Sequence, residues 1–114
     1  RSGNRLTQQN AVTFMKLLSD HTHRLGLSIA QKNSAELLGQ RSQMGTDFSV
    51  VEECSRYDEC QDFVDTYGAG VLMIEYRRAD FTKGCKGFGA THSIVLRDLD
   101  VLPLGETGYV FDGC

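Results

Sequence analysis

Tryptophan is missing from this sequence, proline occurs once, and no apolar run is long. Runs such as residues 71–74 fall far short of the roughly 20 residues that cross a bilayer, so no transmembrane segment is expected. Lys and Arg number 12 against 15 Asp and Glu and are scattered, so no nucleic-acid partner is expected. Residues 1–10 offer neither an initiator methionine nor the apolar core of a signal peptide, which predicts a mature product or a fragment.

What is present suits one ordered domain. The chain has 114 residues, of which 40% are hydrophobic, and this is enough to build a core. Its formal charge of −3 favours neutral or cationic ligands.

The four cysteines form an even set, which indicates disulfides. Four cysteines allow three pairings; Cys54 with Cys60 is the local choice, and this leaves Cys85 with Cys114. A zinc site is the alternative, but the sequence has no CxxC pair and its histidines stand at no ligand spacing from the cysteines, so no metal is expected. Disulfides in turn predict an oxidising, secreted setting.

Apolar periodicity predicts three helices. The longest is expected over residues 7–25, where apolar residues recur along one stripe and Gly26 can take the left-handed cap. A short helix is expected to begin with Ser34 as its N-cap. Another is expected around Phe63 and Tyr67, before the glycines at 68 and 70.

Four apolar segments have the character of strands: residues 27–30, 47–52, 71–75 and 93–96. The glycine-rich segment 79–90 is expected to be loop with at most a turn or two of helix. Residues 99–114 show no clear period and are expected to form a covering segment.

This order of elements predicts a parallel α/β protein. The near-continuous apolar runs indicate strands that are buried on both faces. Four strands with about three helices, opening on a helix, amount to half of an eight-stranded barrel, whose usual length is about 250 residues. The predicted fold is the C-terminal half of a (β/α)8 TIM barrel, with four parallel strands and intervening helices. Residues 1–114 would form that half of a single domain, with the N-terminal half absent from the chain.

Three segments carry a resemblance to a known family: LGLSIAQKNSAELL at 25–38, DFSVVEECSRYDEC at 47–60 and VLMIEY at 71–76. They are similar to the G-L-x-I-x-x-K-N, D-F-x-V-N-E-x-C-x-x-Y-x-E-C and V-x-x-x-E-Y patterns of glycoside hydrolase family 114, the endo-α-1,4-polygalactosaminidases. The resemblance covers nearly the whole chain from Thr7 onward, and it is the ordered set of patterns that makes it specific.

The resemblance implies a retaining glycosidase that cuts α-1,4-linked galactosamine-containing polysaccharide without a metal or organic cofactor. One catalytic acid of the family, the Glu of the E-x-C motif, maps onto Glu52. The other, an Asp in a D-N-x-D-G-Y-type motif, is absent from the chain and would fall just before Arg1. Val51 stands where the family often has Asn, which puts the hydrogen bonding around Glu52 in question.

Glu52 also has a physical reason to be the catalytic residue. It ends an apolar strand, and ligands of parallel α/β proteins collect beyond the carboxyl ends of the strands. Burial there is expected to raise its pKa, as suits a general acid/base. The alternative is an ordinary solvent-exposed glutamate. Glu53 should point away by strand alternation and is left out of the site.

Five further residues are candidates for binding substrate. Glu75 ends another strand and is expected to reach the same ligand as Glu52, unless it pairs with Arg77 or Arg78 instead.

Lys32 and Asn33 supply donors for sugar hydroxyls or for an ionised carboxylate, with plain surface exposure as the alternative. Tyr57 and Tyr76 offer rings for stacking on a sugar, or they serve only in packing.

The chain alone is predicted to be inactive. A half-barrel exposes two strand edges, so it is expected to need an N-terminal half-barrel chain or a second copy of itself. The competing function is a non-catalytic carbohydrate-binding or assembly protein built on a half-barrel.

Overall fold

A five-stranded sheet is the frame of the molecule. The structure, a computed structural model, describes residues 5–114. The strands are β1 (Ala30–Lys32), β2 (Phe48–Glu52), β3 (Val71–Glu75), β4 (Ser93–Arg97) and β5 (Phe111–Gly113), and they lie in that order in the sheet. The helices are α1 (Gln8–Arg24), α2 (Arg41–Met44), α3 (Cys60–Tyr67) and α4 (Arg78–Phe88), with a 3-10 helix η1 over Ala35–Gln40.

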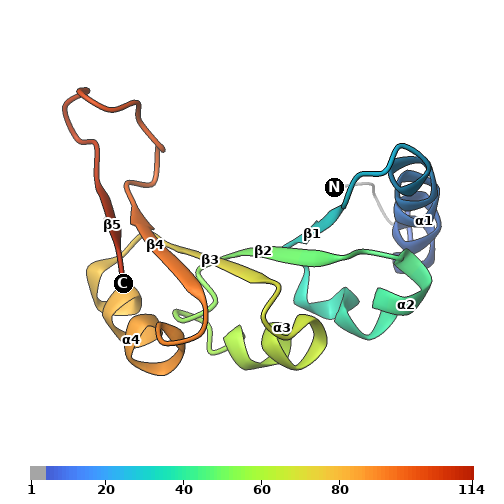
Figure 1. The fold of residues 1–114 in the computed structure, drawn as a ribbon, viewed down its shortest axis with the longest axis horizontal. Helices are drawn as coiled ribbons and strands as arrows, with labels where there is room; N and C mark the ends of the chain where they lie inside the picture. The colour runs from blue at the N-terminus through green and yellow to red at the C-terminus, as the bar shows by residue number, and fades with distance from the viewer. Residues whose placement is uncertain (1–4) are drawn as a thin grey trace.

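The first four strands are parallel, and β5 is antiparallel to β4. Helices α2, α3 and α4 line one face of the curved sheet, while none of the described elements covers the opposite face (Figure 1). Helix α1 stands beside the β1 end, and the loop between β4 and β5 rises at the other end (Figure 1). Parallel strands with helices on their outer side are the arrangement expected for part of a (β/α)8 barrel.

Alternate strand residues build the core between the sheet and the helices. Val51, Met73 and Ile94 point toward the helices, and each is 1% exposed. Phe63 of α3 and Phe81 of α4 belong to the same cluster. This single layer holds the helices on the outer side of the sheet.

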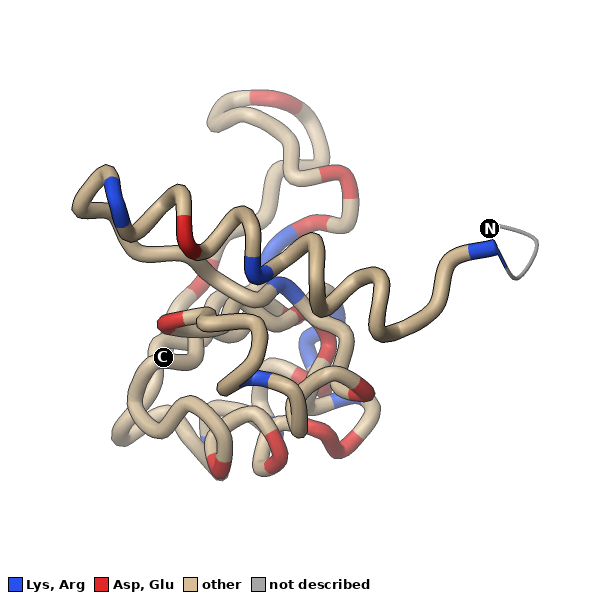
Figure 2. The backbone as a smooth tube through the Cα atoms, turned by 90° about the vertical axis from the view of Figure 1, so that its right-hand side faces the viewer, with Lys and Arg blue, Asp and Glu red and all other residues tan. Residues whose placement is uncertain are grey.

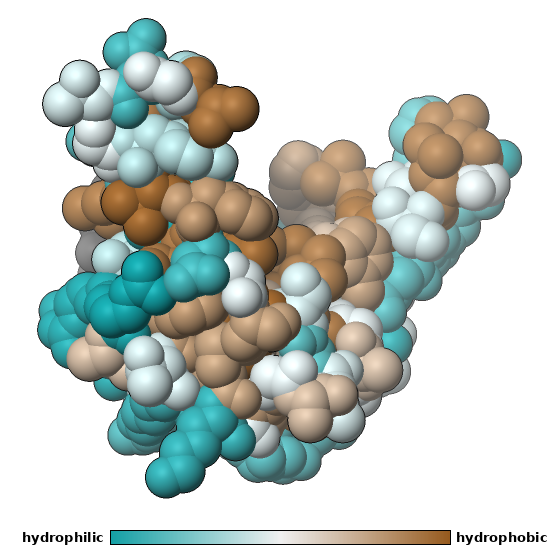
Figure 3. Space-filling model, turned by 60° about the vertical axis from the view of Figure 1, so that its left-hand side comes forward, coloured by the Kyte–Doolittle hydropathy of each residue, from teal (hydrophilic) through white to brown (hydrophobic). Residues whose placement is uncertain are grey.

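The residues between them point to the open inner face. Val50, Ile74 and Val95 are half-buried, and Leu72 is 45% exposed. Burial on both faces was the prediction, but within residues 5–114 only the helix side is covered. Figure 3 shows hydrophobic residues gathered around the hollow between the two raised ends of the molecule.

Several element predictions are confirmed. Helix α1 has Thr7 as its N-cap in a reciprocal pair with Asn10, and Gly26 follows it with a φ of +73°. Strands β2, β3 and β4 and helix α3 occupy the predicted segments to within a few residues. The apolar stripe of α1 is only partly used, because Phe14 and Leu17 remain 56% and 66% exposed.

Two boundaries differ from prediction at the start of the sheet. Strand β1 covers Ala30–Lys32 rather than the predicted residues 27–30, because its pairing with β2 runs from Ala30 opposite Phe48 to Lys32 opposite Val50. Ser34 does not cap a helix: its φ is 60° and its side chain makes no capping hydrogen bond.

Segment 79–90 was predicted to be loop with at most a turn or two of helix, and this is wrong, since the 11-residue helix α4 covers most of it. Gly84 is required by packing rather than by flexibility: a Cβ there would lie 2.5 Å from the Ser55 hydroxyl. Phe81 anchors the helix in the core. The covering segment 99–114 likewise contains one unforeseen strand, β5.

Both predicted disulfides are confirmed. Cys54 pairs with Cys60 across the loop that follows β2. Cys85 of α4 pairs with Cys114, next to β5, and so ties the tail to the helix layer.

Acidic and basic residues are interspersed along the described backbone, with no basic stripe in the view of Figure 2. Among residues 5–114, no helix combines the length and the apolar character needed to span a membrane.

Candidate active site

Glu52 lies at the carboxyl end of β2 on the open inner face, with its side chain 26% exposed. Three side chains from the neighbouring strands converge on its carboxylate. Asn33 donates from Nδ2 to Oε2 at 2.8 Å, and the Lys32 ammonium lies 3.3 Å from the same oxygen. The Tyr76 hydroxyl donates to Oε1. The sheet therefore brings together four of the six predicted site residues.

Asn33 holds Glu52 at two points. Besides donating to the carboxylate, its Oδ1 accepts a hydrogen bond from the Glu52 backbone N–H at 2.7 Å. Its own backbone is left-handed, with a φ of 56°. Left-handed backbone outside glycine is uncommon and is tolerated best by Asn and Asp, so the conformation and the residue type agree.

These contacts keep Glu52 ionised. The hydrogen bonds from Tyr76 and Asn33 lower the pKa of Glu52, and Lys32 adds to the effect, while partial burial opposes it. The prediction that burial raises this pKa is wrong for the residues described, because the donors outweigh desolvation. Burial and the adjacent carboxylate raise the pKa of Tyr76 to about 12, so the phenol remains a donor.

Glu75 lies on the other face of the sheet. It is fully buried among the core side chains, and its Oε1 accepts from the Ser55 N–H at 2.8 Å. Burial raises its pKa. The expectation that Glu75 and Glu52 reach one ligand is therefore wrong: strand alternation turns Glu75 toward the helices. The alternative ion pairs with Arg77 and Arg78 do not form either.

Those two arginines have other partners, since Arg77 lies 2.7 Å from Asp80 and Arg78 lies 2.6 Å from Asp112.

Tyr57 is on the loop between the paired cysteines and is 57% exposed, with the Arg56 guanidinium 5.2 Å from its ring centre. No contact joins it to Glu52 among the described interactions, so its proposed role in stacking stays a prediction.

The ligand atoms of Cys54, Cys60 and Glu75 lie within 4.8 Å of one another. The two sulfurs are bonded to each other, so they are not metal ligands in this state. The Glu75 Oε2 atom has no hydrogen-bond partner among the described residues.

Sequence reasoning missed Gln31. It is 4% exposed and faces the helices, and its amide donates to the Asn33 and Ser34 carbonyls. A polar residue within an apolar strand segment was the available signal, but it does not say which face the side chain takes.

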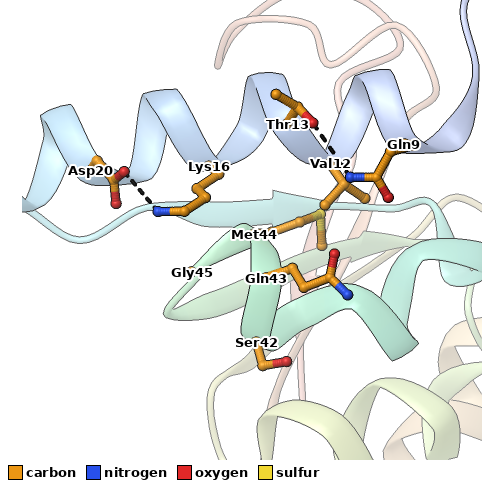
Figure 4. A pocket seen from close by; sticks show the side chains of 9 residues that line it. All are labelled: Gln9, Val12, Thr13, Lys16, Asp20, Ser42, Gln43, Met44 and Gly45. Carbon is orange, nitrogen blue, oxygen red and sulfur yellow. Dashed lines mark hydrogen bonds and ion pairs between the residues drawn. The ribbon is translucent and has the colours of Figure 1, made fainter.

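One surface groove lies away from the residues that contact Glu52. It has a volume of about 360 Å³ and lies on the outside, between α1 and α2, with the Lys16–Asp20 ion pair and Met44 in its wall (Figure 4). None of the side chains that contact Glu52 lines it, so this groove does not mark the candidate active site.

Comparisons with known proteins agree with the geometry. The sequence model of a family described as glycoside-hydrolase family GH114 matches residues 1–114, which confirms the resemblance. The crystal structure of Aspergillus fumigatus Ega3 in complex with galactosamine aligns with a TM-score of 0.77 at 22% identity, over 98% of this chain and 48% of that one. The chain thus matches half of a TIM barrel and spans about half the length of that protein. No curated protein gives a significant match.

Proposed function

The chain belongs to glycoside hydrolase family GH114, and on that premise we propose that it forms one half of a (β/α)8 endo-glycosidase in which Glu52 is a catalytic carboxylate. The proposed substrate is an α-1,4-linked galactosamine-containing polysaccharide, which the galactosamine bound to Ega3 supports. No metal or organic cofactor is proposed.

The observation that carries this proposal is the set of donors around Glu52. An exposed strand-end glutamate with no role would have no need of a two-point hold from Asn33, a phenol from Tyr76 and an ammonium from Lys32. Precise orientation of a carboxylate is what glycoside hydrolysis requires, because two carboxyl groups must flank the scissile bond.

We propose that Glu52 is the general acid/base of a retaining mechanism. Within this half its pKa is lowered, so it needs a second carboxylate nearby to hold a proton. In a retaining enzyme the two carboxyl groups lie about 5 to 5.5 Å apart, and the charge of one raises the pKa of the other. The aspartate expected from the family pattern would supply that charge from the other half of the barrel.

The residues around Glu52 divide between positioning and substrate binding. Asn33 uses both ends of its amide on Glu52, which supports a positioning role. Lys32 is 61% exposed beside the Glu52 carboxylate and Tyr57 is 57% exposed, so a sugar can reach both side chains. Tyr76 completes the hold on the carboxylate, and Glu75 is left out of the proposed site because it is buried on the other face.

Completion of the barrel is proposed to come from an N-terminal half of the same fold. The open inner face supports this, as do exposed apolar side chains at both ends of the sheet. At the α1 end Phe14 and Leu17 are 56% and 66% exposed, and in the loop before β5 Leu99 and Leu104 are 73% and 84% exposed. A second copy of the chain is the alternative partner. Intact mass and sedimentation of the purified protein, with and without reduction, distinguish the two.

The two disulfides support an extracellular site of action, since such bonds persist in oxidising surroundings.

The test uses the complete protein and an α-1,4-linked galactosamine oligomer, with products followed by mass spectrometry. Glu52→Gln keeps the side-chain volume and is expected to lower kcat by about 10²- to 10⁴-fold, the usual contribution of a general acid/base. Glu53→Gln is the matched control: the neighbouring acid pairs with Arg56 instead and should retain near-native activity.

A non-catalytic carbohydrate-binding or assembly protein is the second candidate function. Oligomer binding by the complete protein without any cleavage, unchanged in Glu52→Gln, would establish this alternative and contradict the enzyme.

A further inference from the structure

A buried polar chain runs from the helix layer to the turn that holds Glu52. The Tyr67 hydroxyl of α3 donates to Gln31 Oε1 at 2.7 Å, and the Thr46 hydroxyl lies 2.6 Å from the same phenol oxygen. Because the tyrosine proton is directed at Gln31, Thr46 is the donor to Tyr67. Gln31, Tyr67 and Thr46 are only 4%, 6% and 3% exposed. Burial of this many polar groups is tolerated because each has a partner.

This series of buried hydrogen bonds ends on two backbone carbonyls in a strained turn. The Gln31 amide nitrogen donates to the Asn33 and the Ser34 oxygens, both at 2.9 Å. These two residues have φ values of 56° and 60°, so two consecutive non-glycine residues are left-handed. Such backbone persists only where its surroundings fix it, and it gathers at functional sites.

We propose that Gln31 is a positioning residue for Glu52: it fixes the left-handed turn at Asn33 and Ser34, and the turn in turn aims the Asn33 amide at the Glu52 carboxylate. The inference rests on the proposed function, because it assigns Gln31 a role in the same reaction. Gln31 itself lies on the helix side of the sheet and touches neither Glu52 nor the open face.

Glutamine is chemically specific at this position. Its carboxamide accepts one hydrogen bond, from Tyr67, and donates to two carbonyl oxygens. Methionine has a similar volume but offers neither function. Glutamate keeps the acceptor but, when ionised, turns a second oxygen toward the two carbonyls. A protonated glutamate regains one donor, so Gln31→Glu should work better at low pH than at high pH.

The variants are measured in the complete protein with the galactosamine oligomer. Gln31→Met is expected to lower kcat roughly 10- to 100-fold, as a misplacement of about 1 Å does, with a smaller change in KM. Gln31→Glu should show activity that falls more steeply with rising pH than that of the native protein. Tyr67→Phe removes only the hydroxyl that orients Gln31, and it serves if the Gln31 variants fail to fold.

Two controls separate positioning from general damage to the core. Ser49 is the register partner of Gln31 on β2, is fully buried, and its hydroxyl has no partner among the described residues, so Ser49→Ala should leave kcat unchanged. Val71→Ala creates a cavity on the same face of the sheet but leaves the hydrogen bonds among Thr46, Tyr67 and Gln31 in place. Its kcat therefore measures the effect of lost stability alone.

The outcome also shows which idea fails. If Glu52→Gln abolishes cleavage but folded Gln31→Met and Tyr67→Phe keep native kcat, or lose no more than Val71→Ala, the positioning role is overturned and the proposed function stands. If Glu52→Gln keeps full activity, the proposed function falls, and the role of Gln31 falls with it. An NMR shift of the Glu52 amide signal in Tyr67→Phe supports the inference independently of activity, because that amide donates to Asn33.

Discussion

Changing Asn33 to Asp would replace the amide that donates to the Glu52 carboxylate by a second carboxylate. In the native chain Asn33 Nδ2 donates to Glu52 Oε2 at 2.8 Å, and Oδ1 accepts from the Glu52 N–H at 2.7 Å. Aspartate has nearly the same shape and keeps the second contact. It replaces the first by two oxygens facing each other, which cannot both stay ionised at that distance.

The size of the effect follows from Coulomb's law. Two unit charges about 4 Å apart repel by roughly 4 kcal/mol at an effective dielectric constant of about 20, which corresponds to about 3 pKa units. The Lys32 ammonium, 3.3 Å from Glu52, offsets part of this, so the pair should titrate about 1 to 3 units above native Glu52. Native Glu52 has a lowered pKa, so it adds stability at neutral pH that is lost as the pH falls. Because the variant pair titrates above native Glu52, the stability of the variant relative to the native protein should fall as the pH rises.

Two measurements test this. Carboxyl-detected NMR follows the titration of residues 33 and 52, and urea unfolding across pH follows the stability of native and variant protein. Gln8→Glu adds the same charge on the exposed start of α1 and controls for net charge. An apparent pKa in Asn33→Asp at or below the native value would refute the account of the site given above.

Three further predictions concern Glu52, Glu75 and the disulfide that holds the C-terminal segment. With an aryl oligosaccharide as substrate, azide should rescue Glu52→Ala and give a product of unchanged anomeric configuration, because only the proton donor is lost; an inverted product would make Glu52 the nucleophile instead. Burial raises the pKa of Glu75, so native stability should fall as the pH rises above the ordinary glutamate range, and Glu75→Gln should flatten that fall in urea unfolding from about pH 5 to about pH 8; equal slopes would contradict it. Loss of the Cys85–Cys114 bond, which spans 29 residues, should lower the free energy of unfolding by about 3.6 kcal/mol on chain entropy alone, and a double Cys→Ala variant with unchanged unfolding would show that the tail is held without it.

Much of the fold could be predicted from local patterns. Short apolar segments identified β2, β3 and β4, because strands of a parallel sheet tend to be apolar on both sides. Helix α4 could not be predicted in this way, since its glycines lower helix propensity and its stability comes from Phe81 in the core and the close approach of Gly84 to Ser55.

The candidate site was predictable only in part. Glu52 could be identified as the acid at the end of a strand. The direction of its pKa shift could not be predicted, because its hydrogen-bond donors come from residues 19 and 24 positions away. Glu75 ends an equally apolar strand and looked equivalent. Where both faces of a strand are apolar, the pattern does not say which face meets the helices, and for β3 that face is the one with Glu75.

The sequence Gln31, Lys32, Asn33 shows how a strand end serves two faces at once. Regular alternation would place residues 31 and 33 on the same side of the sheet, toward the helices. Gln31 follows that rule, but Asn33 contacts Glu52, which belongs to the open face. The left-handed φ of Asn33 is what breaks the alternation, at a cost of about 1–2 kcal/mol for most L-residues. Asparagine reduces that cost and supplies both a donor and an acceptor. Glycine would relieve the strain but would supply neither the donor nor the acceptor. The strained turn and the Asn33 side chain therefore act together to orient the Glu52 carboxylate.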